Sequence, residues 1–331
     1  MARFLVCTHK HGMTPFAHRL RTEGHEVEIV VWQPRYNVAW DGQFKEIPRD
    51  SKSRPSKEGL ATLQAELDAD PELVLLTDIW DLELSATTMF PGGPPGESTG
   101  SLRVGGWLGM QGDWMAPHLL IYDFGIWPGG MGRYIPAAVT LVQLEGAASD
   151  LALDHLNAVD GEIGLNEVEL VQDEFGELEA TAHNHGWPWL QTHAFVSELE
   201  NFGELLLGES PKFTPGSKFV TALPVTIPPW PELGRAADAV EIHTTANTRA
   251  NTFWHDVALD TETHTLRSAG LDGLLGVPRG AGNSPSMART KALSVADSIG
   301  CQQKQWRPDI GGTVTPVLDA IAEHFGVDPW A

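Results

Sequence analysis

The chain has 331 residues, which at roughly 100–200 residues per domain is enough for two or three packed units. Its 44 acidic and 22 basic side chains give a formal net charge of −22, which argues against a nucleic-acid or anionic-membrane partner. No apolar run reaches the roughly 18–20 residues of a membrane span. Cys7 and Cys301 are too few for a disulfide framework, and the N-terminus has no secretory signal, so we expect a cytoplasmic protein.

The first 80 residues predict a small Rossmann-like unit. Arg3–Cys7 and His25–Trp32 are apolar strand segments, and Pro15–Glu23 lies between them as a helix with a threonine–proline start and a glycine stop. Lys57–Ala69 is helical by composition, and Pro71–Asp78 is a third buried strand. Strands and helices that alternate with short links are typical of a parallel sheet.

The rest of the chain predicts more strands than helices. Phe90–Gly100 (FPGGPPGESTG) has the composition of a linker or an exposed loop. We then expect strands at Ser101–Met110 and Trp114–Asp123, a glycine-rich turn at Gly125–Gly132, a helix at Ala147–Leu156, a hairpin of Glu162–Gln172 and Gly176–Ala182, a helix at Ser197–Gly208, strands from Lys218 onward, and helices at Ser284–Ile299 and Thr315–Phe325.

Three segments, in this order along the chain, carry a resemblance to a known enzyme family. Asp123–Pro136 (DFGIWPGGMGRYIP) is similar to the GPNTGGMG-x-Y-x-P loop of phosphoribosylamine–glycine ligases, which are ATP-grasp enzymes of purine synthesis. Gly176–Thr181 (GELEAT) lies where that family has its LEFN-x-RFG-D-P-E strand. Gly270–Val277 (GLDGLLGV) and Gln305–Gly311 (QWRPDIG) resemble the segments that close the family's sequence.

The resemblance implies an α/β fold with α+β segments in three parts. These are a Rossmann-like N-terminal domain over residues 1–88, a reduced ATP-grasp lobe over 101–215 and a closing domain over 216–331. The family reaction uses ATP to activate the carboxylate of glycine as an acyl phosphate, which the amine of phosphoribosylamine attacks. ATP and Mg²⁺ are therefore the cofactors that the resemblance implies.

The sequence departs from the family where the nucleotide would bind. The family has a lysine-bearing ATP lobe between its first domain and the GGMG loop, and an independent lobe takes about 50 residues. Residues 79–100 number only 22 and contain no lysine, so we expect the lobe to be absent and the isolated chain not to bind Mg-ATP. The turn Thr8–Gly12 contains a single glycine, which also disfavours a phosphate site there.

The predicted substrate site uses the GGMG loop and the segment after the second motif. Its residues are Trp127, Gly129, Gly130, Met131, Gly132 and His183. Glycines allow close approach of the backbone, whose N–H groups would face a carboxylate or a phosphate. A tight strand connection that binds nothing is the equally weighted alternative. Trp127 stands where the family has asparagine, which predicts a narrower and more apolar cleft.

Two metal sites are considered. Glu179 is the acidic position retained from the family's metal strand, and Mg²⁺ prefers oxygen ligands, but a surface glutamate on a strand is the favoured interpretation. His183 and His185 are spaced to share one face of a strand, with His193 nearby, but a solvated loop is favoured over a transition-metal site. The twelve tryptophans either fill cores, which is favoured, or line a binding surface.

Two functions from different classes follow. The first is a divergent carboxylate–amine ligase whose nucleotide site is rebuilt or supplied by a partner chain. The second is a non-catalytic descendant that binds a small metabolite or another protein through the old substrate cleft. The order of the motifs favours the first function, and the loss of individual residues favours the second. No catalytic residue is assigned by either.

Overall fold

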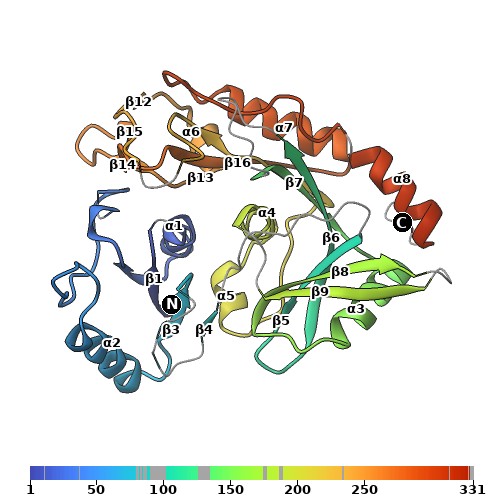
Figure 1. Cartoon of the computed structure of the whole chain (residues 1–331), viewed down its shortest axis with the longest axis horizontal. Helices are drawn as coiled ribbons and strands as arrows, with labels where there is room; N and C mark the ends of the chain where they lie inside the picture. Colours follow the sequence, from blue (N-terminus) through green and yellow to red (C-terminus); the bar gives the residue numbers. More distant parts are fainter. Residues whose placement is uncertain are drawn as a thin grey trace.

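Three β-sheets and the helices that cover them make up the computed structural model (Figure 1). The structure describes residues 1–331 except 11, 37, 80–81, 83, 85–87, 90–101, 126–134, 174–176, 186–188, 233–234, 313, 327 and 329–331. Side chains at 88–89, 124–125, 135–136, 181–185, 189 and 324–325 also lie outside the description. Within the described ranges, no helix is both long and apolar enough to span a bilayer.

The N-terminal sheet is parallel, with strand order β2-β1-β3-β4. Its elements are β1 (Arg3–Thr8), α1 (Thr14–Thr22), β2 (Glu26–Val31), α2 (Lys57–Ala69), β3 (Val74–Thr77) and β4 (Thr88–Met89). The apolar run Leu5–Cys7 is completely buried, as expected for a strand covered on both faces. The predicted strand–helix–strand unit is confirmed, with ends that differ by a few residues.

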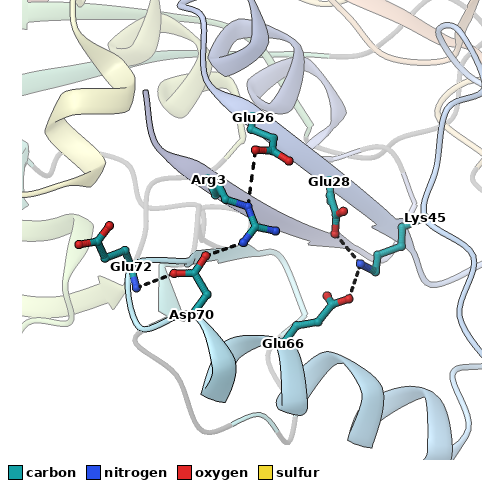
Figure 2. Close-up of polar contacts among 7 residues, drawn as sticks. All are labelled: Arg3, Glu26, Glu28, Lys45, Glu66, Asp70 and Glu72. Atoms are coloured by element: carbon teal, nitrogen blue, oxygen red, sulfur yellow. Dashed lines mark hydrogen bonds and ion pairs between the residues drawn. The ribbon is translucent and has the colours of Figure 1, made fainter.

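Charged side chains join one end of this sheet to α2 (Figure 2). Two basic residues each bridge two acids at N–O distances of 2.5–3.6 Å: Arg3 with Glu26 and Asp70, and Lys45 with Glu28 and Glu66. Most of these side chains are partly exposed, so water and salt screen the pairs. They therefore contribute little to the free energy of unfolding.

The second sheet has nine strands, eight of them in the order β11-β16-β10-β7-β6-β5-β8-β9, and β13 pairs with β16. The strands are β5 (Leu102–Leu108), β6 (Trp114–Gly125), β7 (Ile135–Gln143), β8 (Gly164–Gln172), β9 (Leu178–His185), β10 (Phe219–Ala222), β11 (Val225–Thr226), β13 (Thr252–Trp254) and β16 (Leu274–Gly282). Strands from both sides of residue 215 hydrogen-bond in this one sheet. The domain boundary expected at that residue stays a prediction.

The two faces of the nine-stranded sheet are covered by different helices. One face packs against α4 (Trp189–Glu198), and the same hydrophobic cluster extends through α1 to the N-terminal sheet. The opposite face packs against α3 (Gly146–Asn157), α7 (Pro285–Asp297) and α8 (Val314–Phe325). A small third sheet of β12 (Glu241–Ile242), β15 (Leu266–Ser268) and β14 (Val257–Leu259), together with α6 (Ala246–Ala250), completes the C-terminal part.

The helix predicted at Ser197–Gly208 is wrong in its position. The structure has α4 at Trp189–Glu198 and a separate short helix α5 at Phe202–Leu206. All residues from Leu190 to Glu198 are buried, so α4 lacks the alternation of apolar and polar faces by which a surface helix is recognised. The predicted linker Phe90–Gly100 lies outside the described residues, as does most of the turn Gly125–Gly132.

The two cysteines are expected to differ in reactivity. Cys7 is completely buried in β1, and burial, followed by the nearby Asp78 carboxylate, raises the pKa of its thiol to about 12. Cys301 is only half-buried, and burial raises its pKa against the opposing effect of Lys304. Because the thiolate is the reacting form, iodoacetamide should modify Cys301 first and Cys7 only after unfolding. Peptide mass spectrometry measures this order, and equal labelling of the two in the native protein would contradict it.

Candidate functional site

The predicted substrate site falls largely outside the described residues. This applies to Trp127, Gly129, Gly130, Met131 and Gly132, and to the side chain of His183. Glu179 is described, and it is an exposed residue of β9 opposite Val171 of β8. A β-bulge adds one residue to β9 between Glu179 and His183, so the simple two-residue alternation of faces is interrupted between these positions.

Two of the three motif segments that suggested the family meet in space. The backbone N–H of Gly311, at the end of the QWRPDIG segment, donates a hydrogen bond of 2.7 Å to Oδ2 of Asp123, where the first motif begins. The Arg289 guanidinium on α7 donates to the carbonyl of Ile310. The C-terminal motif therefore lies against the end of β6.

The GLDGLLGV segment, in turn, is bonded to the N-terminal unit. Asp272 is buried, and its Oδ2 accepts hydrogen bonds of 2.8 Å from Nζ of Lys10 and from the hydroxyl of Tyr36. Arg35 donates to the same Tyr36 hydroxyl. Lys10 lies in the turn after β1, so these contacts fix the carboxyl end of β1 against the C-terminal part of the chain.

A carboxylate lies at the turn between β1 and α1, where a Rossmann-like fold would place a phosphate. Asp78 accepts hydrogen bonds from the Thr8 hydroxyl (2.9 Å) and the His9 backbone N–H (2.7 Å). Burial raises the pKa of Asp78, although these two donors oppose the shift. A Cβ on Gly12 would be 2.4 Å from Oδ2 of Asp78. The prediction that this turn disfavours a phosphate agrees with a resident carboxylate there.

A buried cluster of charges lies on the face of the nine-stranded sheet that α4 covers. Arg103 of β5 donates to Oε1 of Glu167 at 2.7 Å and to Oε2 of Glu169 at 3.3 Å, both on β8. The Tyr122 hydroxyl on β6 donates to the other oxygen of Glu167 at 2.8 Å, and the Arg103 guanidinium lies 5.2 Å from the centre of the Tyr122 ring. The Arg103 side chain is 5% exposed and that of Glu167 is 0% exposed.

For Glu167 and Arg103, burial and the neighbouring opposite charge shift the pKa in opposite directions. Burial raises the pKa of Glu167, while Arg103 and the Tyr122 hydroxyl oppose the shift. Burial and the charge of Glu167 raise the pKa of Tyr122, so its hydroxyl remains a donor. Burial lowers the pKa of Arg103, but Glu167, Tyr122 and Glu169 together outweigh it and the net shift is upward. The Arg103 guanidinium therefore forms hydrogen bonds with two carboxylates, and these bonds keep the guanidinium charged inside the protein.

This cluster was missed from the sequence, although a signal was present. Glu167 and Glu169 are two residues apart in an otherwise apolar strand segment, so both must lie on the same face. Arg103 is the single basic residue of a second apolar strand. Two acids and one base in buried strands predict a pair, because a buried charge without a partner is costly.

The two metal sites stay predictions, because the side chains of His183 and His185 lie outside the description. Among the described residues, no group of three or more His, Cys, Asp or Glu is arranged to hold a metal. His193 is completely buried on α4, and its Nε2 lies 2.8 Å from Nε2 of His255. Three tryptophans with described side chains, Trp107, Trp230 and Trp254, are buried in the hydrophobic clusters, as the core-filling interpretation expects.

Comparisons with known proteins identify the fold. No family model matches the sequence, and no curated protein matches it either. The phosphoribosylamine–glycine ligase of Thermotoga maritima matches with a TM-score of 0.60 at 12% identity, over 92% of this chain and 99% of that chain.

Two longer enzymes match over part of their length. A pyruvate carboxylase of Rhizobium etli has a TM-score of 0.54 at 12% identity, over 91% of this chain and 36% of its own. The urea amidolyase of Kluyveromyces lactis has a TM-score of 0.52 at 8% identity, over 100% of this chain and 22% of its own. Identities this low establish the fold alone. This chain shares the mixed α/β fold of these enzymes.

Proposed function

We propose that this chain is a divergent carboxylate–amine ligase-like protein that binds a small molecule and has lost ATP-dependent ligation. The observation that carries the proposal is the pairing of Arg103 with both Glu167 and Glu169. In the family that the sequence resembles, Mg²⁺ is held by carboxylates of the sheet together with phosphates of the nucleotide. In this chain the carboxylates of Glu167 and Glu169, two residues apart on β8, are bound to the internal cation Arg103, which leaves them unsuited to hold Mg²⁺.

Mg²⁺ does not fit this arrangement. The ion needs carboxylate oxygens in an octahedral shell, but both oxygens of Glu167 already accept hydrogen bonds, one from Arg103 and one from Tyr122. A divalent cation would also have to lie beside the Arg103 guanidinium, and like charges in a buried site repel strongly. Occupancy by Mg²⁺ would require the displacement of Arg103 from a position where it is almost completely buried.

The residues where a nucleotide would be expected to bind support the same proposal. Residues 79–100 contain no lysine, and the Asp78 carboxylate lies at the β1–α1 turn, where it would repel a phosphate. We therefore derive no step through ATP or Mg²⁺. The GGMG loop and Glu179 remain the proposed substrate cleft.

The strand register is compatible with this cleft. Leu119, Val104, Val168 and His183 form one row across β6, β5, β8 and β9. The 126–134 loop follows the end of β6, and Glu179 lies toward that same end of β9. Three strand spacings of about 4.8 Å separate the two strands, roughly 14 Å in all.

A ligase whose nucleotide site comes from a partner chain is the second candidate. It is favoured by the retention of the fold, since the match to the Thermotoga maritima enzyme spans 99% of that chain. This candidate predicts ATP turnover only in a complex. The isolated chain should behave in the same way under both candidates.

The first test is binding of Mg-ATP to the purified chain, measured by calorimetry and by the shift in unfolding temperature. Binding at a hundredfold excess over the dissociation constant would add about 2.7 kcal/mol to the free energy of unfolding. We expect no saturable heat and no shift with ATP, with Mg²⁺ alone or with both together. The Thermotoga maritima ligase in the same assay is the positive control.

Saturable ATP binding at micromolar concentration would overturn the proposal. A triple variant extends the test. Arg103→Met combined with Glu167→Gln and Glu169→Gln removes the charged cluster without leaving a buried charge. This triple variant should also fail to respond to Mg-ATP. ADP release from ATP by the isolated chain, in the presence of amine and carboxylate substrates, would contradict both candidates. ADP release only in a complex with a partner chain would favour the second candidate.

A further inference from the structure

A cavity of about 460 Å³ lies between the N-terminal and C-terminal parts of the chain, away from the cluster around Arg103. One wall is a face of α1, and the others are α6, β13, one residue of β16 and Trp40. Figure 1 shows α1 beneath β13 and α6, and residues of α1 and β13 are in contact. The volume falls in the range of about 300–1,000 Å³ that is usual for small-molecule sites.

The cavity is basic although the protein is acidic. Its lining includes three arginines, Arg19, Arg249 and Arg279, and none of its lining residues is Asp or Glu, in a chain with a net charge of −22. Two of the arginines are held in place by hydrogen bonds. Arg19 pairs with Glu23 at 2.6 Å and donates to the backbone carbonyl of Leu199. Arg249 donates to the hydroxyl of Thr244 and to the backbone carbonyl of His264. Three cations around one cavity repel one another unless an anion lies between them.

Arg279 of β16 brings a guanidinium to the cavity. Its guanidinium carries five N–H donors, and among the described residues none of them has a hydrogen bond or an ion pair, while the backbone N–H of Arg279 bonds to Asn251. Burial and then the charge of Arg19 lower the pKa of Arg279 to about 10, and Glu198 acts in the opposite direction. Oε2 of Glu198 instead accepts a hydrogen bond from Gln143, and it lies 3.3 Å from Nε2 of His118.

A second donor in the same cavity also lacks a partner. Thr252 of β13 is 8% exposed, and its hydroxyl makes no hydrogen bond to any described residue. Buried polar groups are nearly always hydrogen-bonded, so each exception calls for a ligand or a water molecule. Thr252 is a lining residue, but its hydroxyl oxygen is closed to solvent, so among the described residues the Arg279 guanidinium is the unpartnered donor that a ligand in the cavity can reach.

The rest of the lining is flat and apolar. The Trp40 ring stacks on His18 of α1, with ring centres 4.2 Å apart and planes 16° from parallel. Trp40 has φ of 53°, a strained value for a bulky residue, and its backbone is bonded on both sides to β14, which fixes the ring at the cavity. A ligand therefore meets an aromatic wall as well as the arginines.

We propose that this cavity binds a small organic oxyanion, a carboxylate or a phosphate ester with a flat apolar body, whose oxygens are bound by Arg279. Arg249 and Arg19 add positive charge at the cavity, and the body of the ligand packs on Trp40. The site is separate from the predicted substrate cleft and does not depend on the fate of the ligase reaction.

Calorimetric titration with three probes tests the proposal: phenyl phosphate, benzoate and the neutral benzyl alcohol. Both anions should bind saturably, and benzyl alcohol should bind at least tenfold more weakly. The stronger of the two anions identifies the source, a phosphate ester or a carboxylic acid. Equal binding of the neutral and anionic probes, or no binding of either anion, would overturn the proposal.

Variants place the binding in this cavity. Arg279→Met should weaken the preferred anion about tenfold or more, since a charge-assisted hydrogen bond is lost, and it should leave the unfolding temperature without ligand unchanged or higher. The matched control is Arg267→Met, at an exposed arginine of β15 outside the cavity, which should leave the affinity unchanged. Arg249→Gln, at an exposed position on α6, should weaken binding several-fold. Unchanged affinity in both cavity variants would place the anion elsewhere and contradict the proposal.

Discussion

Replacement of Arg103 by methionine is expected to lower the free energy of unfolding by about 3–5 kcal/mol, because it leaves two buried carboxylates without their cation. Glu167 is completely buried and Glu169 is 8% exposed, and they lie on one face of the same strand. Methionine keeps much of the volume of the arginine stem, so the loss reflects charge more than a cavity. Urea denaturation at neutral pH, followed by circular dichroism, measures the change.

The pH dependence of unfolding shows whether the loss of stability in Arg103→Met comes from charge or from packing. Burial raises the pKa of Glu167 already in the presence of Arg103, and removal of the guanidinium should raise it further. A carboxyl group whose pKa is higher in the folded state stabilises the fold when it is neutral. The contribution of neutral Glu167 should therefore be fully present below its ordinary pKa of about 4.3. The stability of the variant should fall as pH rises from there through the raised pKa of the folded state, and should recover on acidification.

Two further variants complete this test. Glu167→Gln in the Arg103→Met background should recover part of the stability, since an amide carries no charge. Arg267→Met, at an exposed position in β15, is the matched control and should change stability by less than about 0.5 kcal/mol. An unchanged midpoint for Arg103→Met, or a loss that does not depend on pH, would show that the three charges are not coupled as described.

The N-terminal unit was predictable because local sequence determines it. The run Leu5–Cys7 has to be buried, and the helix Lys57–Ala69 begins where Ser56 accepts a hydrogen bond from the backbone N–H of Gly59, a capping pattern visible in the sequence. By contrast, α4 is buried on all sides, and residues 137–142 of β7 are also all buried. Both therefore lack a periodic pattern, and both were missed.

The candidate site was less predictable than the fold, because its contacts join distant parts of the chain. Arg103 and Glu167 are 64 residues apart, and Lys10 and Asp272 are 262 apart. The sequence indicates that a buried charge needs a partner, but only the register of β5 and β8 selects which one. The cavity around Arg279 was likewise not predictable, because Arg19 on α1 and Arg249 on α6 are far apart in the sequence.

Close approach of the backbone was predicted at the GGMG loop, and in the described part of the chain it occurs at Gly280 of β16. A Cβ on Gly280 would lie 2.2 Å from the backbone nitrogen of Ala292 and 2.4 Å from the backbone oxygen of Ala288, both on α7. These neighbours are main-chain atoms, so no side-chain rotation can relieve the overlap. Either α7 or β16 has to move as a whole.

Gly280→Ala should therefore cost about 3 kcal/mol or more, at or above the upper end of what overpacking usually costs, and Gly280→Val should prevent folding. The control is Gly312→Ala, because that residue is exposed and its added Cβ would meet only the oxygen of Asp309 at an ordinary 3.8 Å. Because β16 also carries Arg279, a shift of β16 in Gly280→Ala should weaken anion binding in the cavity as well. A midpoint of urea denaturation for Gly280→Ala equal to that of Gly312→Ala would mean that α7 does not pack on β16 as closely as described.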